Sequence, residues 1–114
     1  MVQGDGPTGI TVKTLVSLLR IGDVKIVCMP GELFPELAYK TGESTGVSAT
    51  VKEILGEDFM VMGLFDDEIG YIVPPKDFLL HDKNPYFEKA SSGHYEETNS
   101  LGPQTAGILL DTLA

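Results

Sequence analysis

The sequence predicts an α/β fold: a small mixed sheet with a β-hairpin and a parallel β-α-β crossover, flanked by about three helices. Two apolar, β-branched runs separated by Gly22-Asp23 predict the hairpin. A third apolar run, at 59–65, follows two short helical patterns. Strand, helix and strand within about forty residues is typical of a right-handed parallel crossover.

The composition is that of one acidic globular domain. The chain has 114 residues, of which 42% are hydrophobic, and this length suits a single domain. We expect residues 10–114 to form it, and the Gly- and Pro-containing start at 1–9 to be disordered or tag-like. The net charge of −9 excludes a nucleic-acid partner, which would need clustered Lys and Arg. No run of about 18 apolar residues predicts a transmembrane segment.

The first half of the chain supplies the strands and helices in alternation. The hairpin strands are expected at 10–21 and 24–29, where a Pro-Gly pair ends the second strand. Apolar residues then recur at helical spacing, and Glu32 places a carboxylate in the first turn, which predicts a helix over 32–40.

The crossover is completed by a second helix and the third strand. A polar loop is expected at 41–46. Ser48 is placed to cap a helix over 49–55, and Gly56 to end it. The uninterrupted apolar run at 59–65 then predicts a buried strand.

The second half is polar and irregular until the last helix. A long loop is expected over 81–100, and such loops usually serve a binding site or contact a partner. His81 and His94 fall in it at a spacing that does not suit two metal ligands on one helix, so we expect both to be solvated. Pro103 begins a closing helix over 103–113.

Three sets of residues are candidates for chemistry: one glutamate, an acidic run and two tyrosines. Each has a structural explanation beside the functional one. Glu32 lies where a buried strand turns into a helix, the place where α/β folds collect functional groups, although a helix N-terminal acid has the same pattern. The acidic run 66–68 could bind a hard cation or form a solvated turn. Tyr71 and Tyr95 could equally be packing aromatics with a solvated hydroxyl.

Three blocks, taken in order, resemble the C-terminal part of the catalytic domain of neutral/alkaline, non-lysosomal ceramidases. The first is RIGD at 20–23, an apolar strand, and PGE at 30–32. The second is MGL at 62–64 with GYIVPPKDF at 70–78, and the third is YEETNSLGPQT at 95–105. The blocks occur in the order found in that family and together span most of the chain.

The resemblance implies a zinc-dependent amidohydrolase. In that family two histidines, a glutamate and a tyrosine hold zinc, and a zinc-bound water attacks the amide carbonyl of an N-acylsphingosine. Glu32 matches the zinc glutamate and Tyr71 the zinc tyrosine, and Tyr95 matches the catalytic tyrosine that donates a hydrogen bond to the developing oxyanion. These residue types suit that chemistry, since hard oxygen ligands complete a site that imidazoles begin.

The resemblance also implies which parts are missing. The family's two zinc histidines lie upstream of the first block, so we expect this chain to be the C-terminal part of a longer protein, with zinc bound in the full-length parent and none in this chain alone. The upstream half of the same protein is then the expected partner, and the isolated chain is expected to be inactive. Apolar surface left uncovered would favour a homo-oligomer.

The alternative function is a non-catalytic acidic module that binds a protein or a calcium ion. The position of three residues distinguishes the two hypotheses: Glu32, Tyr71 and Tyr95 should meet on one concave surface in a hydrolase, and should lie on separate faces in a module. The single cysteine, Cys28, allows no internal disulfide and leaves the cellular compartment open.

Overall fold

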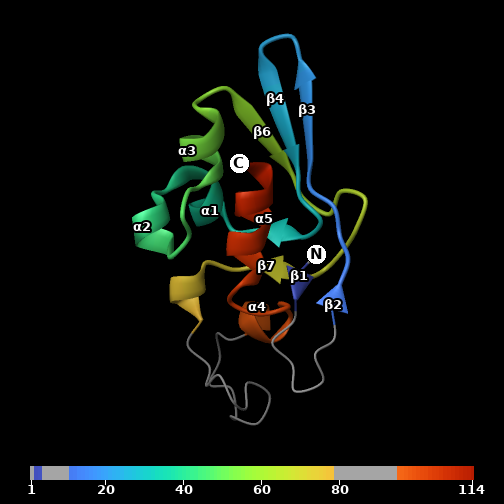
Figure 1. The fold of residues 1–114 in the computed structure, drawn as a ribbon, viewed down its shortest axis with the longest axis vertical. Coiled ribbons are helices and arrows are strands. Elements are labelled where there is room, and N and C mark those ends of the chain that lie inside the picture. Colours follow the sequence, from blue (N-terminus) through green and yellow to red (C-terminus); the bar gives the residue numbers. More distant parts are fainter. Residues whose placement is uncertain (1, 4–10, 79–94) are drawn as a thin grey trace.

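The computed structural model describes residues 2–3, 11–78 and 95–114, with backbone alone at 2–3. Figure 1 shows the arrangement of the elements. In chain order they are β1 (Val2–Gln3), β2 (Thr11–Val12), β3 (Ser17–Ile21), β4 (Val24–Cys28), β5 (Glu32–Leu33), α1 (Pro35–Tyr39), α2 (Gly42–Thr45), α3 (Val51–Leu55), β6 (Phe59–Met62), β7 (Tyr71–Ile72), a 3-10 turn η1 (Pro75–Asp77), α4 (Tyr95–Thr98) and α5 (Thr105–Leu113).

The predicted α/β fold with a mixed sheet is confirmed. β3 and β4 form the antiparallel hairpin, and Gly22 takes the left-handed conformation that its tight turn requires, with φ of 62°. β6 lies parallel to β4 on the other side, so that Val27 faces Val61 across the pair. The segment from α1 to α3 is therefore the crossover connection.

A second parallel pair, β5 with β7, forms a separate two-stranded sheet that follows β4 in the chain. The backbone bends at Pro30, whose carbonyl accepts a hydrogen bond from Ile69 N–H at 2.8 Å, and Met29 N–H donates to Met62 O at 2.9 Å. The expectation that a helix begins at residue 32 is therefore wrong, because Glu32 and Leu33 pair with β7 instead. The helix α1 begins at Pro35, where a proline at the first turn costs no hydrogen bond.

The helices that follow are positioned by hydrogen bonds from side chains. Thr50, rather than Ser48, precedes α3: its buried hydroxyl donates to Lys40 O at 2.7 Å. The carboxylate of Glu53 accepts from Thr50 N–H at 3.1 Å and from Gly42 N–H at 2.6 Å, and these bonds lower the pKa of Glu53. The Glu53 carboxylate thus joins α3 to α2. α2 is a single turn of helix in the segment 41–46, which we expected to be a loop.

Several strand and helix boundaries differ from those we expected, because short strand pairings override the local sequence pattern. The first hairpin strand begins at Ser17, since Thr11–Val12 pairs with Val2–Gln3, inside the start expected to be tag-like. α4 lies inside the expected loop over 81–100, and the closing helix begins at Thr105. His81 and His94 lie outside the described residues. In the described part of the chain, no helix is long and apolar enough to cross a membrane.

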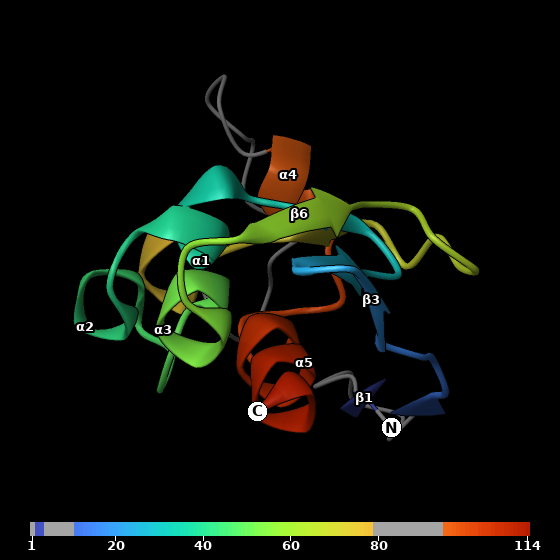
Figure 2. The same ribbon diagram turned by 90° about the horizontal axis from the view of Figure 1, so that it is seen from above.

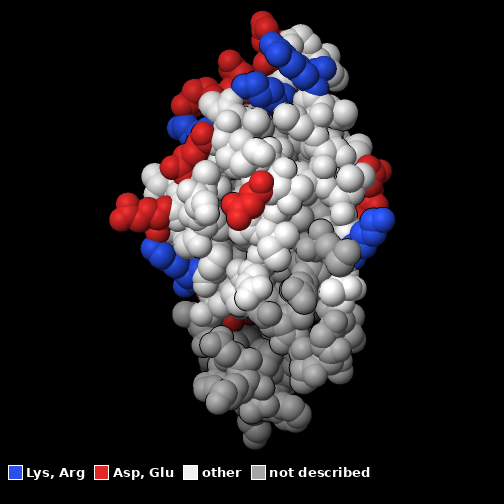
Figure 3. Space-filling view, viewed as in Figure 1, with Lys and Arg blue, Asp and Glu red and all other residues white. Residues whose placement is uncertain are grey.

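The core lies between the sheet and the helices on one of its sides. Figure 2 shows α3 and α5 below β6 and β3, and α4 on the opposite side. Figure 3 looks onto this helix-covered side, where acidic and basic side chains gather mainly around the periphery. The buried apolar cluster comprises Val27, Met29, Leu37, Ala38, Val47, Val51, Ile72, Ala106, Leu109 and Leu110.

We predict that Thr50→Ala destabilises the domain by about 1–2 kcal/mol, because it removes the buried hydroxyl that satisfies Lys40 O. Urea unfolding of the purified protein measures the change. The matched control is Thr112→Ala, whose exposed hydroxyl bonds only within α5 and should change stability by less than about 0.5 kcal/mol. Equal losses in the two variants would contradict the assignment.

Candidate functional site

The register of the two short strands brings Glu32 and Tyr71 together. β5 and β7 are parallel, with Glu32 directly opposite Tyr71 and Leu33 opposite Ile72. Glu32 N–H donates to Gly70 O at 3.1 Å, which fixes this register. Because side chains of opposite residues share a face, the carboxylate and the phenol leave the pair on the same side.

Two glycines allow the backbones to approach closely enough for this pairing. A Cβ on Gly31 would lie 2.3 Å from Gly70 O, which no real contact allows. Gly70 has a φ of 94°, and a Cβ there would lie 2.1 Å from Asn99 O. The site therefore depends on two positions at which the chain has no side chain.

Tyr95 reaches the same place from a distant part of the sequence. It begins α4, and the turn after this helix brings Asn99 O to accept a hydrogen bond from Tyr71 N–H at 3.0 Å. The Asn99 side chain donates to Tyr95 O at 2.7 Å, so the turn is closed on itself. The rings of Tyr71 and Tyr95 then meet edge to face with centroids 5.8 Å apart.

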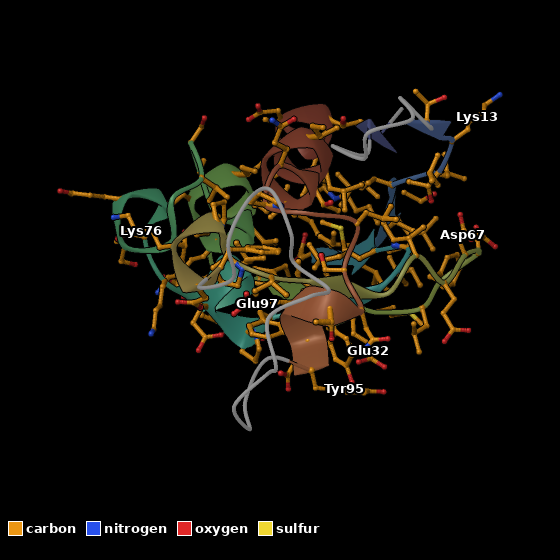
Figure 4. The ribbon with its side chains drawn as sticks, turned by 90° about the horizontal axis from the view of Figure 1, so that it is seen from below. Lys13, Glu32, Asp67, Lys76, Tyr95 and Glu97 are labelled. Atoms are coloured by element: carbon orange, nitrogen blue, oxygen red, sulfur yellow. The ribbon has the colours of Figure 1, made fainter. Side chains whose placement is uncertain are left out.

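The three residues selected from the sequence line one pocket of about 240 Å³. Figure 4 shows Glu32 and Tyr95 extending on the same side of the molecule. The pocket is completed by Leu64, Glu68, Gly70 and Asn99. Convergence on a concave surface is thus a feature of the structure, whereas the metal and oxyanion roles of the three side chains stay predictions.

The electrostatics of the pocket are set by carboxylates. Of the described residues that line it, Glu32 and Glu68 are charged and none is basic. A hydrogen bond to the Glu32 carboxylate raises the pKa of the Tyr71 phenol, and partial burial and neighbouring negative charge raise it further. The Tyr71 hydroxyl therefore keeps its proton at neutral pH and donates it toward Glu32.

The acidic run 66–68 does not act as a unit. Glu68 lines the pocket, but the Asp67 carboxylate accepts a hydrogen bond from Thr14 at 2.7 Å, which lowers the pKa of Asp67. Figure 4 shows Asp67 well away from Glu32. Burial raises the pKa of the Cys28 thiol, and the nearby charge of Asp66 adds to that effect. Of the three acids, Glu68 alone is among the residues that line the pocket.

Asn99 and Leu64 were not found by sequence reasoning. Asn99 contributes its backbone carbonyl, and a backbone contact cannot be predicted from the type of the residue. Leu64 lies in a loop with φ of 52°, a rare conformation for leucine that an apolar pattern does not indicate. No group of three or more His, Cys, Asp or Glu side chains is arranged for a metal ion within 11–78 and 95–114.

No protein-family model matches this chain, and no match is found for it among the curated proteins or the solved structures. Any function assigned to this chain therefore depends on the three sequence blocks and on the geometry of the pocket.

We predict that Gly31→Ala destabilises the domain by about 2 kcal/mol or more, because the added methyl group would overlap Gly70 O. The control is Gly107→Ala, in α5, where nothing lies within 4 Å of the added atom. A glycine inside a helix is unfavourable relative to alanine, so this variant should be more stable by about 0.5–1 kcal/mol. Chemical denaturation measures the change in the free energy of unfolding, which should have opposite signs in the two variants. Destabilisation of both would contradict the predicted overlap at Gly31.

We predict that Glu32→Gln lowers the pKa of Tyr71 toward its ordinary value of about 10, because the charge that disfavours the phenolate is lost. Since the folded-state pKa of Tyr71 is raised, the interaction stabilises the fold below the unfolded pKa and is lost as pH rises through the folded pKa. Ultraviolet titration of the tyrosines measures the shift. The part of the titration curve that disappears in Tyr71→Phe belongs to Tyr71.

The control for this titration is Glu36→Gln, because Glu36 lies in α1 and does not line the pocket. This variant should leave the Tyr71 component unchanged. An unaltered Tyr71 titration in Glu32→Gln would show that the two side chains are not coupled.

Proposed function

We propose that this chain provides part of the active site of a zinc-dependent amidohydrolase of the ceramidase type. Glu32 and Tyr71 would be metal ligands, and Tyr95 would be the donor to the oxyanion. The single observation that supports this proposal is the convergence of these three side chains, from β5, β7 and α4, on one pocket.

The donor pair fits a zinc ion in its chemistry. Carboxylate and phenolate oxygens are hard ligands that can share a tetrahedral zinc with imidazoles. Glu32 and Tyr71 are directly opposite each other in the β5–β7 pair and line the same pocket. Both oxygens can therefore be directed to one ion.

Two oxygen donors are half of a tetrahedral site. A closed zinc site needs four ligands, and the described residues offer no larger cluster of ligands. We expect the other two ligands to be the histidines of the upstream half of the same protein, as the sequence resemblance implies. On this expectation the isolated chain is inactive and has low affinity for zinc.

Each residue of the pocket then has a distinct role. Bound zinc would supply a water of lowered pKa and a polarised carbonyl. Tyr71 must release its proton before its oxygen binds the ion. Its raised pKa opposes this release at neutral pH, so metal binding should strengthen as pH increases. Tyr95, whose side chain is largely exposed, presents a phenol that can donate to an oxygen placed beside Tyr71.

Geometry favours this proposal over the calcium-binding module. A calcium site needs six to eight oxygen ligands around one point, and the carboxylates of 66–68 are directed to different surroundings.

We predict that Co²⁺, a spectroscopic substitute for zinc, binds this chain weakly, and that imidazole added as a substitute for the missing histidines increases its affinity. Glu32→Gln and Tyr71→Phe should each lower that affinity about tenfold or more. Binding should weaken as pH falls, because the Tyr71 proton then competes with the ion. Visible absorption of tetrahedral Co²⁺ measures both effects.

The matched control is again Glu36→Gln, which should bind Co²⁺ as the unmodified chain does. Co²⁺ affinity that is the same in all three variants would contradict the assignment of the ligands. Absence of zinc from the full-length parent protein, purified without chelator, would remove the hydrolase proposal altogether.

A further inference from the structure

The strand β3 lies at an edge of its sheet and is largely uncovered. The strand order is β3-β4-β6, so among the described residues β3 (Ser17–Ile21) pairs with β4 alone. In Figure 1 the β3-β4 hairpin projects from the body of the molecule. The large aliphatic side chains of β3 are exposed, Leu18 by 48%, Leu19 by 45% and Ile21 by 68%. An exposed apolar edge strand is a site where another strand can pair.

Two residues of β3 direct their main-chain groups to the open edge. On β4, Lys25 N–H donates to Asp58 O, directly before β6, at 3.2 Å, so this odd-numbered residue faces β6. Alternate residues of a strand face opposite neighbours, and the even-numbered residues of β4 therefore bond to β3. Their partners in the register are the odd-numbered residues of β3. The N–H and C=O groups of Leu18 and Arg20 consequently point away from β4, toward the place where a further strand would lie.

The side chains of β3 are divided between the two faces of the sheet. Leu18 is opposite the buried Val27, on the face that α3 and α5 cover. Leu19 and Ile21 alternate with Leu18 and lie on the other face, which also carries the 56% exposed Met60. A strand added beside β3 would need apolar side chains on both of its faces to pack against these residues.

A basic position lies in the middle of this edge. Arg20 is directly opposite Lys25, and like charges at opposite positions oppose pairing. Lys25 donates to Leu55 O, which directs its amine toward α3. The Arg20 side chain is 70% exposed; it donates to Gly22 O at 3.1 Å, and its contact with the fully exposed Asp23 is 4.0 Å long. Such an exposed ion pair contributes little, so the guanidinium can accept a carboxylate from a further strand.

We propose that β3 binds an extended peptide segment of a partner protein as a fourth strand, antiparallel to β3, with an Asp or Glu residue opposite Arg20 and apolar residues opposite the three aliphatic side chains. Main-chain hydrogen bonds to Leu18 and Arg20 would supply the affinity, and the acid would supply the specificity. Antiparallel pairing is the commoner arrangement and the more stable one per residue.

Arg20 also makes the edge selective. A charged residue on an edge strand opposes pairing with strands that lack a complementary charge. β3 has the sequence SLLRI with no acidic residue, so a second β3 paired edge to edge would bring no carboxylate to Arg20. The hairpin 17–28 has two basic side chains and one acidic side chain, although the whole chain carries a charge of −9. It is therefore a locally basic part of an acidic molecule, which an acidic partner segment can approach.

The first test is a titration of the isotope-labelled full chain with the capped peptide STVEVVTS, followed by NMR. In the antiparallel register its glutamate is opposite Arg20 and its valines are opposite the aliphatic residues of β3. We expect the amide signals of β3 to shift with a dissociation constant of about 0.1–1 mM, because a short peptide loses conformational freedom when it pairs. Replacing the glutamate by lysine should weaken binding about fivefold. Absence of any shift in β3 at about 2 mM peptide would overturn the proposal.

The second test distinguishes strand addition from a simple charge contact. N-methylation of the glutamate amide removes a donor that faces β3 and places a methyl group in the ladder, so binding should be lost. N-methylation of the next valine, opposite Leu19, alters an amide that points away from β3 and should change the affinity by less than about twofold. Equal effects of the two methyl groups would overturn strand addition, and loss with the valine alone would overturn the antiparallel register.

The third test exchanges the charges. Arg20→Glu should weaken binding of the glutamate peptide about fivefold and strengthen binding of the lysine peptide. The matched control is Lys13→Glu, which makes the same change of net charge outside β3 and should leave both affinities unchanged. Affinities that do not respond to Arg20→Glu would overturn the assignment of the acid. Self-association of the chain that protects the Leu18 and Arg20 amides from hydrogen exchange would assign the edge to a second copy and overturn the proposal.

The peptide site and the zinc site are separable in these experiments. β3 contributes no residue to the pocket of Glu32, Tyr71 and Tyr95. Peptide binding that persists in a chelating agent and in Glu32→Gln supports the proposal whether or not Co²⁺ binds. Peptide binding that Glu32→Gln abolishes would place the peptide in the pocket and overturn the proposal.

Discussion

The close approach of three backbone segments holds this molecule's pocket together. Gly31, Gly70 and Asn99 meet where any side chain on either glycine would overlap a carbonyl oxygen. The hydrogen bonds from Glu32 N–H to Gly70 O and from Tyr71 N–H to Asn99 O join the segments in that order. These hydrogen bonds join main-chain atoms. The contacts between the backbone segments, rather than the packing of the side chains themselves, therefore place the candidate residues.

A pocket lined by two carboxylates and two phenols has a clear electrostatic preference. With no basic side chain among its described lining residues, it favours a cation, a proton or a hydrogen-bond donor. The Tyr71 proton meets part of that preference by its hydrogen bond to Glu32. A metal ion would meet it in another way, and the zinc proposal therefore arises from this imbalance of charge.

Local patterns predicted the elements that depend on neighbours in sequence. The Gly22-Asp23 turn, the end of the helix at Gly56 and the apolar run at 59–65 are determined by contacts within a few residues, so the hairpin and crossover were predicted correctly. The two-residue strands β5 and β7 were missed, because each exists only through pairing with the other across the 37 positions, 34–70, that lie between them. For the same reason Glu32 was placed in a helix, although it was selected as a candidate residue from the PGE block.

The sequence by itself determined the fold class, the acidic charge and the identities of the three candidate residues. Each of these can be recognised from the composition, from the hydrophobic periodicity or from a short sequence block. Tertiary structure alone decided that Glu32, Tyr71 and Tyr95 share one pocket, that Asp67 turns away to Thr14, and that one side of the sheet is left apolar and exposed. The physical reason is that a parallel pairing and a close backbone contact are properties of two distant segments together, and neither segment carries the information alone.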